Sequence, residues 1–289
     1  MDGGILLVDK PRGMTSADVV RAVTRHTGQK CGHLGTLDPM ATGLLVVFMG
    51  NALRLVSCYQ KGRKRYLAEV AFGSATDTYD AEGRVVDTCQ VPDDLGSRLA
   101  ACLPQFVGKQ QQTVPAFSAV RVRGRRLYDL AREGREMDLP EREICIDALR
   151  MTAVDGPLAR LDVTCSSGTY IRSLARDLGR AVGCPAHLAA LRRVESAPFS
   201  VEEAVPLSAF LQGPRGIPES LLSPEDRLPE LPVRRISVEE ERRLLDGRRI
   251  AGAGFEGAEA IMLLSADGRI VAVGTFERGE IRTRRAMGG

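Results

Sequence analysis

Residues 30–45 read KCGHLGTLDPMATGLL, and they place one carboxylate, Asp38, in a segment that cannot form a helix. Its three glycines permit tight turns or a close approach of the backbone to a ligand. Pro39 drives the residue before it out of helical geometry. An Asp before Pro is also a common turn opener, because its side chain bonds nearby backbone N–H groups. The segment therefore indicates either a structural turn or a carboxylate held out on a shaped loop.

The sequence on either side predicts how this loop is held. Upstream, residues 5–8 are apolar and predict a short buried strand, and Thr15 with Ser16 caps the helix that follows. Downstream, residues 44–48 predict an apolar strand. A phosphate-binding loop of the Walker type is excluded, because that pattern needs its lysine after the glycines. The Asp38 loop therefore joins a capped helix to an apolar strand.

Two later segments show clear periodicity. Residues 66–72 alternate with a period of two, which predicts a strand with Tyr66 on its core-facing side. Residues 170–182 carry apolar side chains at helical spacing, and Arg172 lies off that apolar stripe. The pattern alone is typical of a core aromatic at Tyr66, with its hydroxyl hydrogen-bonded, whereas Arg172 is free to reach beyond its helix.

Composition excludes several classes of protein. The seven cysteines are widely spaced without a Cys-x-x-Cys pair, and there are only three histidines, so we expect neither a disulfide framework nor a metal site. The residues after Met1 lead directly into an apolar strand, and no apolar run approaches the ~20 residues of a membrane helix. We therefore expect a cytoplasmic protein with reduced thiols.

Five groups of residues, in order along residues 3–200, resemble the motifs of the TruB family of tRNA pseudouridine synthases. They are LVDKPRGMTS at 7–16 with the 30–45 segment, KRY at 64–66 with GSATDTYD at 73–80, FSAVR at 117–121 with GRRLY at 124–128 and AR at 131–132, GTYIRSLARDLG at 168–179, and AHL with LRR at 186–193. Each group is weak alone, but five in register are very hard to obtain by accident.

The resemblance implies an enzyme that isomerises the T-loop uridine of tRNA to pseudouridine. The reaction breaks the N1–C1′ bond, turns the uracil and joins C5 to C1′, without redox change, cofactor or metal. Asp38 matches the family's reacting carboxylate, and Arg172 matches its cationic partner. Breaking a glycosidic bond builds positive charge at C1′, which a carboxylate stabilises or captures. Attack of Asp38 at C1′, attack at C6 and a glycal route all stay open.

The target base must be extruded from its loop, at a cost of a few kcal/mol. The resemblance implies that Tyr66 stacks on the flipped uracil with its hydroxyl near the departing C5 proton. It also implies that His33 occupies the space the nucleotide leaves, or alternatively that this side chain only bonds the loop backbone. Tyr170 and Leu191 complete the predicted base-binding pocket.

Basic residues gather locally although the net charge is only +3. Six arginines lie between Pro115 and Arg135, against two acidic residues. Basic patches on a nearly neutral chain can form a directed phosphate-binding surface, although exposed arginines also simply solvate helices. The predicted RNA contacts are Lys10, Lys64, Arg121, Arg125, Arg126, Arg192 and Arg193.

The predicted architecture is α+β, with a mixed, mainly antiparallel central sheet flanked by helices, as in the pseudouridine synthase fold. We expect a catalytic domain over 1–230, with an RNA-gripping, protruding insertion at about 105–140 and a proline-rich linker at about 214–232. Residues 233–289 read as a small, mainly β module that resembles a PUA-type RNA-binding domain. A hairpin turn at 266–268 and a helix from Ser237 through Leu245 are expected there.

Two further functions are compatible with the sequence. The chain could instead be a guide-RNA-dependent subunit of a ribonucleoprotein, or an RNA-binding and tRNA-folding protein in which catalysis is secondary. The Arg-rich 115–135 segment favours a stand-alone enzyme that recognises the T-arm of tRNA. We also expect a monomer without an obligate protein partner, because nothing suggests a self-complementary apolar face. Phe117 and Arg121 depart from the commonest Tyr and Lys of the third motif, which affects fine contacts and not the reaction.

Overall fold

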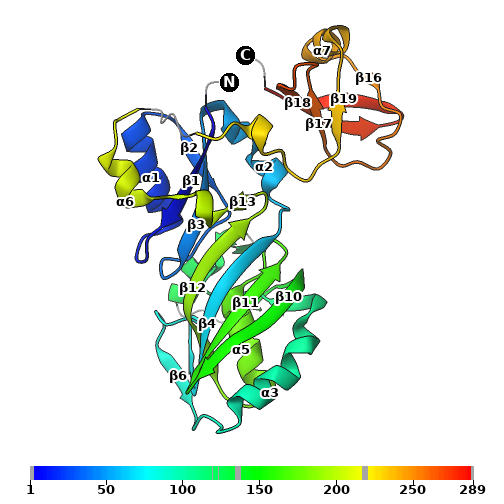
Figure 1. Ribbon diagram of the computed structural model, residues 1–289. Helices are drawn as coiled ribbons and strands as arrows, with labels where there is room; N and C mark the ends of the chain where they lie inside the picture. The colour runs from blue at the N-terminus through cyan, green and yellow to red at the C-terminus, as the bar shows by residue number, and fades with distance from the viewer. Residues whose placement is uncertain (1–2, 119, 123, 134–137, 217–220, 288–289) are drawn as a thin grey trace.

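A ten-stranded sheet forms the main body of the molecule (Figure 1). The computed structural model describes residues 3–118, 120–122, 124–133, 138–216 and 221–287. The main path of the sheet runs β14-β1-β3-β12-β4-β11-β10-β7, with β2 paired to β3 and β13 to β12. Its strands are β1 (Ile5–Lys10), β2 (Cys31–Leu34), β3 (Thr42–Met49), β4 (Lys64–Phe72), β7 (Gly108–Thr113), β10 (Glu141–Asp155), β11 (Leu158–Cys165), β12 (Ala186–Ser196), β13 (Phe199–Ser200) and β14 (Val205–Pro206).

The sheet is mixed and mainly antiparallel, as predicted. The β1–β14 and β3–β12 pairs are parallel, and the other pairs of this sheet within the described residues are antiparallel. The consecutive strands β3 and β4 are not neighbours, because β12 lies between them and pairs with both. This arrangement brings the β2–β3 loop, β4 and β12 to one region of the sheet.

Several helices accompany the sheets, and those that begin at residues 16, 171 and 238 start within one residue of the predicted positions. They are α1 (Ser16–Thr27), α2 (Val56–Tyr59), α3 (Leu95–Cys102), α4 (Leu127–Arg132), α5 (Ile171–Val182), α6 (Leu207–Gln212) and α7 (Val238–Leu245). Thr15 is the N-cap of α1, and its hydroxyl accepts from the Asp18 amide while the Asp18 carboxylate accepts from the Thr15 amide. Such a capping box satisfies two backbone donors that the first helical turn leaves unpaired.

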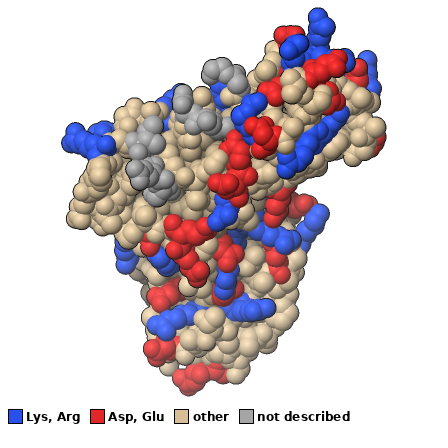
Figure 2. All heavy atoms as spheres, turned by 45° about the horizontal axis from the view of Figure 1, so that its top comes forward, with Lys and Arg blue, Asp and Glu red and all other residues tan. Residues whose placement is uncertain are grey.

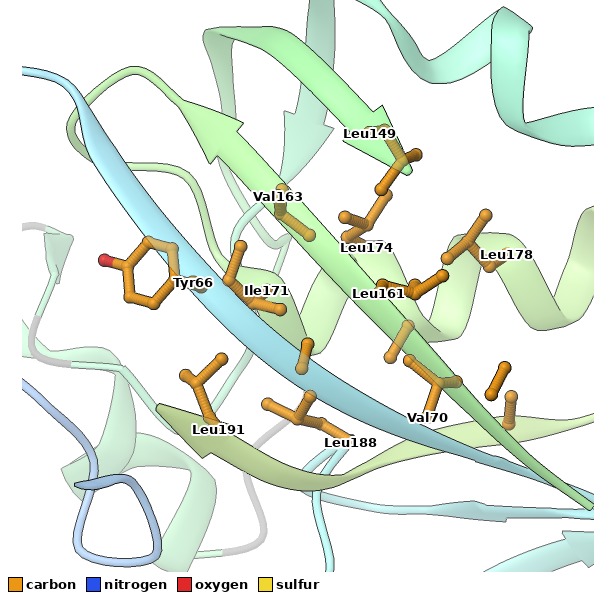
Figure 3. Packing of buried hydrophobic residues seen from close by; sticks show 14 of the residues in the cluster. Tyr66, Val70, Leu149, Leu161, Val163, Ile171, Leu174, Leu178, Leu188 and Leu191 are labelled. Atoms are coloured by element: carbon orange, nitrogen blue, oxygen red, sulfur yellow. The ribbon is translucent and has the colours of Figure 1, made fainter. Parts of the chain in front are cut away.

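The larger apolar core lies between α5 and one face of β4, β11 and β12 (Figure 3). Val70, Leu161, Leu174 and Leu188 are almost fully buried there, and each such side chain contributes about 1.5–3 kcal/mol by leaving water. Tyr66 lies at one end of this cluster, with its hydroxyl pointing away from the other labelled side chains (Figure 3). The predicted core-facing side of this strand is confirmed.

The C-terminal residues form a second sheet of five strands, in the order β15-β17-β18-β19-β16. These are β15 (Val233–Arg235), β16 (Ile250–Ala251), β17 (Ile261–Leu264), β18 (Ile270–Glu277) and β19 (Glu280–Ala286). The predicted helix and hairpin are confirmed, because Ser237 caps α7 and β17 pairs antiparallel with β18. Met262 and Val273 of the second sheet belong to one buried apolar cluster with Phe48 of β3 and Tyr59 of α2. This cluster joins the two sheets.

Two predicted segments are corrected by the structure. Residues 31–34 are a strand and not part of the loop, since they pair with β3. The prediction of a protruding insertion over 105–140 is wrong for residues 108–113, which form strand β7 beside β10. That strand is rich in Gln and lies at the sheet edge, so it lacks an apolar alternation. In the 214–232 linker, the Leu222 amide and carbonyl both bond the Ile5 backbone at 2.9 Å.

Two short hairpins extend from the larger sheet. One is formed by β5 (Ser74–Thr76) and β6 (Val85–Thr88), and the other by β8 (Arg121–Val122) and β9 (Arg125–Arg126). The β5–β6 hairpin is tied to β12, because the Leu188 amide donates to the Tyr79 carbonyl and the Ala81 amide donates to the Leu188 carbonyl, both at 3.0 Å. It therefore reaches the region where β4 and β12 meet.

Gly43 is required by the close approach of β3 to β12. A Cβ at Gly43 would lie 2.3 Å from the Arg193 carbonyl oxygen, and its φ is +96°. We expect Gly43→Ala to lower the free energy of unfolding by about 3 kcal/mol, from overpacking together with a strained backbone. Urea unfolding measures this loss. Gly28→Ala is the control, because φ there is +70° but nothing lies within 4 Å of the added methyl group. Equal losses in the two variants would contradict the steric argument.

Candidate active site

The loop that carries Asp38 is fixed from the side of β1 and α1. Lys10 Nζ, at the end of β1, donates to the Ala41 carbonyl at 2.7 Å and to the Pro39 carbonyl at 3.3 Å. Ser16 Oγ, in the first turn of α1, lies 2.8 Å from the Leu37 amide and 3.0 Å from the Leu37 carbonyl oxygen. The loop is therefore held by buried polar contacts on both sides of Asp38.

A buried arginine holds the beginning of the same loop. Arg193 on β12 is fully buried, and its Nη2 donates to the Gly35 carbonyl at 3.1 Å while its Nε donates to the Leu44 carbonyl at 2.8 Å. The prediction that Lys10 and Arg193 contact RNA is therefore wrong, since neither side chain is exposed. Burial lowers the pKa of Lys10 to about 8, against the opposing attraction of the Asp38 carboxylate.

Asp38 forms a two-point ion pair with Arg172. Arg172 Nε lies 2.9 Å from Asp38 Oδ2, and Nη2 donates to Oδ1 at 3.2 Å. The arginine side chain is 6% exposed, whereas that of Asp38 is 33% exposed. Arg172 also donates to the Thr78 carbonyl at 3.1 Å and to the Phe117 carbonyl at 3.0 Å. The guanidinium is thus locked on its buried side, and the carboxylate keeps an accessible face.

Asp80 is a second carboxylate at Arg172 that we did not predict. Its Oδ2 lies 3.5 Å from Arg172 Nη1, and its Oδ1 accepts from the Thr78 hydroxyl at 2.6 Å and from the Glu82 amide at 3.0 Å. A buried arginine flanked by two carboxylates is compensated in charge. The sequence holds Asp80 within a motif, but nothing there tells which acidic side chain of the hairpin turns inward.

These groups line a cavity of about 610 Å³. Its wall brings together six of the predicted site residues, which come from the β2–β3 loop, β4, β12 and the start of α5. They are Asp38, Lys64, Tyr66, Tyr170, Arg172 and Leu191. The cavity also includes Ser118, whose buried hydroxyl has no hydrogen-bond partner among the described residues. An unpaired buried hydroxyl beside an accessible carboxylate is a free position for a polar ligand atom.

Tyr66 presents a neutral phenol to this cavity. Burial raises the pKa of its hydroxyl above the ordinary value. The ring is 7% exposed and packs at the end of the core cluster. Tyr66 can therefore stack on a flat ligand and exchange a hydrogen bond, but it does not supply a phenolate at neutral pH.

His33 lies outside the residues that line the cavity. It is the third residue of β2, and its Nδ1 is buried without a hydrogen-bond partner in the described part of the chain. Burial and the neighbouring Arg193 lower the pKa of His33, so the imidazole is neutral at pH 7. The structure thus does not bring His33 together with Asp38 and Tyr66 around one space.

The remaining predicted RNA contacts are dispersed. Arg192 donates two hydrogen bonds to Asp9, at 2.9 and 2.8 Å, and stays partly exposed. Arg125 is exposed and pairs with Glu133. The side chains of Arg121 and Arg126 lie outside the described residues. On the face shown in Figure 2, basic and acidic side chains are interspersed and do not form one basic field.

The described ranges offer neither a metal site nor a membrane-spanning helix. There, no group of three or more His, Cys, Asp and Glu side chains is placed to hold a metal ion. Among the same residues, no helix is long and apolar enough to cross a membrane.

Comparisons with known proteins match this chain along most of its length. Residues 22–171 match the family described as TruB family pseudouridylate synthase (N terminal domain), and residues 172–215 match the tRNA pseudouridylate synthase B C-terminal domain. The chain is 44% identical to tRNA pseudouridine synthase B of Syntrophotalea carbinolica, over 83% of this chain and 79% of that protein. It is 40% identical to the protein of that name from Thermobifida fusca, over 96% of both.

A solved structure shares the fold. A chain in the structure of a Cbf5-Nop10-Gar1 complex superposes with a TM-score of 0.75, over 99% of this chain and 85% of that one, at 23% sequence identity. This likeness extends over both sheets, and it bears on the fold alone.

Proposed function

The chain belongs to the TruB family of pseudouridylate synthases, and we propose that it isomerises the T-loop uridine of tRNA to pseudouridine with Asp38 as the reacting carboxylate. Relatives named tRNA pseudouridine synthase B, at about 40% identity over nearly the whole chain, support tRNA as the substrate. The observation that carries the assignment of residues is the Asp38–Arg172 pair on the wall of the cavity.

The reaction needs a carboxylate that is fixed, ionised and accessible. As the N1–C1′ bond breaks, positive charge develops at C1′, and the Asp38 oxygens stabilise or capture it. Arg172 holds these oxygens from the buried side, so the carboxylate does not have to reorganise during the reaction. The freed uracil then turns, C5 bonds to C1′, the C5 proton leaves and N1 gains a proton.

The flipped base needs a flat, largely apolar pocket beside Asp38. Tyr66, Tyr170 and Leu191 supply it from three different elements. Aromatic stacking suits any flipped base, whereas hydrogen bonds to the base edge select uracil. Ser118, with its unpaired hydroxyl in the same wall, is suited to such a bond. These contacts offset the free-energy cost of extruding the nucleotide.

We propose that RNA contacts extend beyond the cavity to both parts of the chain. We assign catalysis to residues 1–230 and additional RNA contact to the PUA-like residues 233–289. Lys64, Arg125 and Arg192 remain partly or fully exposed and are the described basic residues that we assign to phosphate contact. Function as a monomer in the cytoplasm without an obligate protein partner completes the proposal.

Lys64 gives this binding surface a pH dependence. Burial, aided by the nearby Arg193, lowers the pKa of Lys64 to about 8. The ammonium is therefore present below pH 8 and lost as the pH rises through that value. Between about pH 7 and pH 9, the affinity for tRNA should fall in both the wild-type chain and Lys64→Met. We expect the fall to be roughly tenfold larger in the wild-type chain, because only there is one charged hydrogen bond lost.

Equilibrium binding at several pH values measures this difference, in an Asp38→Asn background so that no tRNA is converted. The control is Lys109→Met, which removes an exposed lysine on β7 that does not line the cavity. Parallel pH profiles for the wild type and Lys64→Met would contradict a contact between Lys64 and RNA.

Incubation of the purified chain with an unmodified tRNA transcript tests the function itself. We expect pseudouridine at the T-loop uridine without any guide RNA. Modification only after a guide RNA is added would assign the chain to the guide-dependent class. Tight binding without modification would assign it to RNA-binding proteins in which catalysis is secondary.

A further inference from the structure

Two cysteine thiols meet away from the cavity, at the base of the β5–β6 hairpin. Cys89 follows β6 directly, and Cys184 lies just beyond the end of α5. Their sulfur atoms are 2.9 Å apart, although 95 residues separate them in the sequence. Both are free thiols, Cys89 exposed and Cys184 buried. A disulfide bond needs about 2.05 Å between the sulfurs, so the two atoms are within about 1 Å of bonding distance.

The backbone around the pair keeps it together. The Gly73 amide donates to the Pro185 carbonyl at 2.8 Å, and the Cys89 amide donates to the Gly73 carbonyl at 3.0 Å. The Cys184 amide donates to the Gly179 carbonyl at 2.9 Å, which fixes it on the last turn of α5. The segments that carry the two thiols are therefore bonded to each other, and a covalent link requires only a small side-chain movement.

We propose that Cys89 and Cys184 are a modification site that forms a reversible disulfide by exchange with a low-molecular-weight disulfide such as oxidised glutathione. The Cys89 thiolate attacks the small disulfide, forms a mixed disulfide and releases one small thiolate. The Cys184 thiolate then attacks Cys89 Sγ and releases the second. Two protein thiols are oxidised, and one small disulfide is reduced to two small thiols. The two released small thiolates take up the protons that the cysteines lose.

Exposure decides the order of these steps. The oxidant reaches Cys89 first, because Cys184 is 1% exposed. Burial raises the pKa of Cys184 to about 11, so the second step is slow at neutral pH. At pH values below about 11, the rate of this step should increase about tenfold for each unit by which the pH is raised, since the thiolate is the attacking form.

The link would join the hairpin and the helix that together hold the reacting pair. Thr78 and Asp80, between β5 and β6, contact Arg172 near the start of α5. The thiols join the same hairpin and the same helix at the other end. A disulfide here would fasten the frame of the Arg172 site, although neither cysteine itself lines the cavity. The chemistry of the thiols does not depend on the proposed function.

The test incubates the full-length chain with oxidised glutathione at about pH 8.5, near the ordinary pKa of a thiol. The chain is then denatured, and its free thiols and intact mass are measured. We expect about five titratable thiols instead of seven, and a mass lower by about 2 Da. A cross-linked peptide containing Cys89 and Cys184 is expected, and dithiothreitol should restore all seven thiols.

Two variants make the outcome decisive. Cys89→Ser changes an exposed residue, and this variant should keep all its remaining thiols after treatment with oxidised glutathione. The matched Cys58→Ser variant should still lose two of its remaining thiols under the same treatment. The proposal is overturned if the wild-type chain keeps all its thiols, if glutathione stays on Cys89 without a cross-link, or if Cys89 is found joined to another cysteine.

Discussion

Asp38→Asn is expected to lower the rate of pseudouridine formation by roughly 10⁴-fold or more, because the amide neither carries the charge that stabilises C1′ nor captures the sugar. The substitution keeps the size of the side chain, and the loop remains held by Lys10 and Ser16. Affinity for tRNA should stay within about tenfold of the wild type, since phosphate contacts dominate binding. Single-turnover conversion and equilibrium binding measure the two quantities separately.

Asp155→Asn is the matched control for this prediction. Asp155 is exposed at the end of β10 and does not line the cavity, so the variant should convert tRNA at the wild-type rate. If Asp38→Asn lost binding as completely as conversion, the division between a reacting carboxylate and a separate phosphate-binding surface would be wrong.

Arg172→Lys is expected to lower the single-turnover rate by roughly 10²-fold while tRNA affinity changes little. Lysine keeps the charge, but one ammonium cannot contact both Asp38 oxygens and also donate to the Thr78 and Phe117 carbonyls. The Asp38 carboxylate would then be free to turn, and in a fraction of the complexes with tRNA it would have the wrong orientation for reaction. Arg180→Lys, at an exposed position on the same helix, should leave the rate unchanged.

A neutral substitution at Arg172 separates positioning from stability. Arg172→Met leaves the nearly buried Asp80 carboxylate without its cation, so unfolding free energy should fall by about 3–5 kcal/mol. Urea unfolding of both variants measures this difference. A lysine variant as unstable as the methionine variant would show that shape, and not charge, is what the site requires of Arg172.

Much of the site's placement was predictable from the sequence. Period-two alternation placed Tyr66 on the buried face of its strand, and the motif groups placed Asp38 opposite Arg172. Tyr170 and Leu191 line the same cavity. The chemical roles of these residues remain predictions, because their positions alone do not test them.

The basic residues could not be sorted from the sequence. Lysine and arginine are almost never fully buried, so the sequence favours an exposed, RNA-facing position for Lys10 and Arg193. In the structure their donors bond loop carbonyls, a pairing that depends on where β1 and β12 lie relative to that loop. Strand β7 cannot be predicted from apolar alternation, because an edge strand can be polar along its length.

The position of β12 between β3 and β4 has a consequence for synthesis of the chain. The two flanking strands leave the ribosome more than one hundred residues before β12 does, so the edges that will face β12 lack their native partner in that interval. Arg193 reaches the Asp38 loop only when β12 is inserted. Assembly of the site is therefore a late, long-range event, and a nascent chain that ends before this strand holds a carboxylate without its final support.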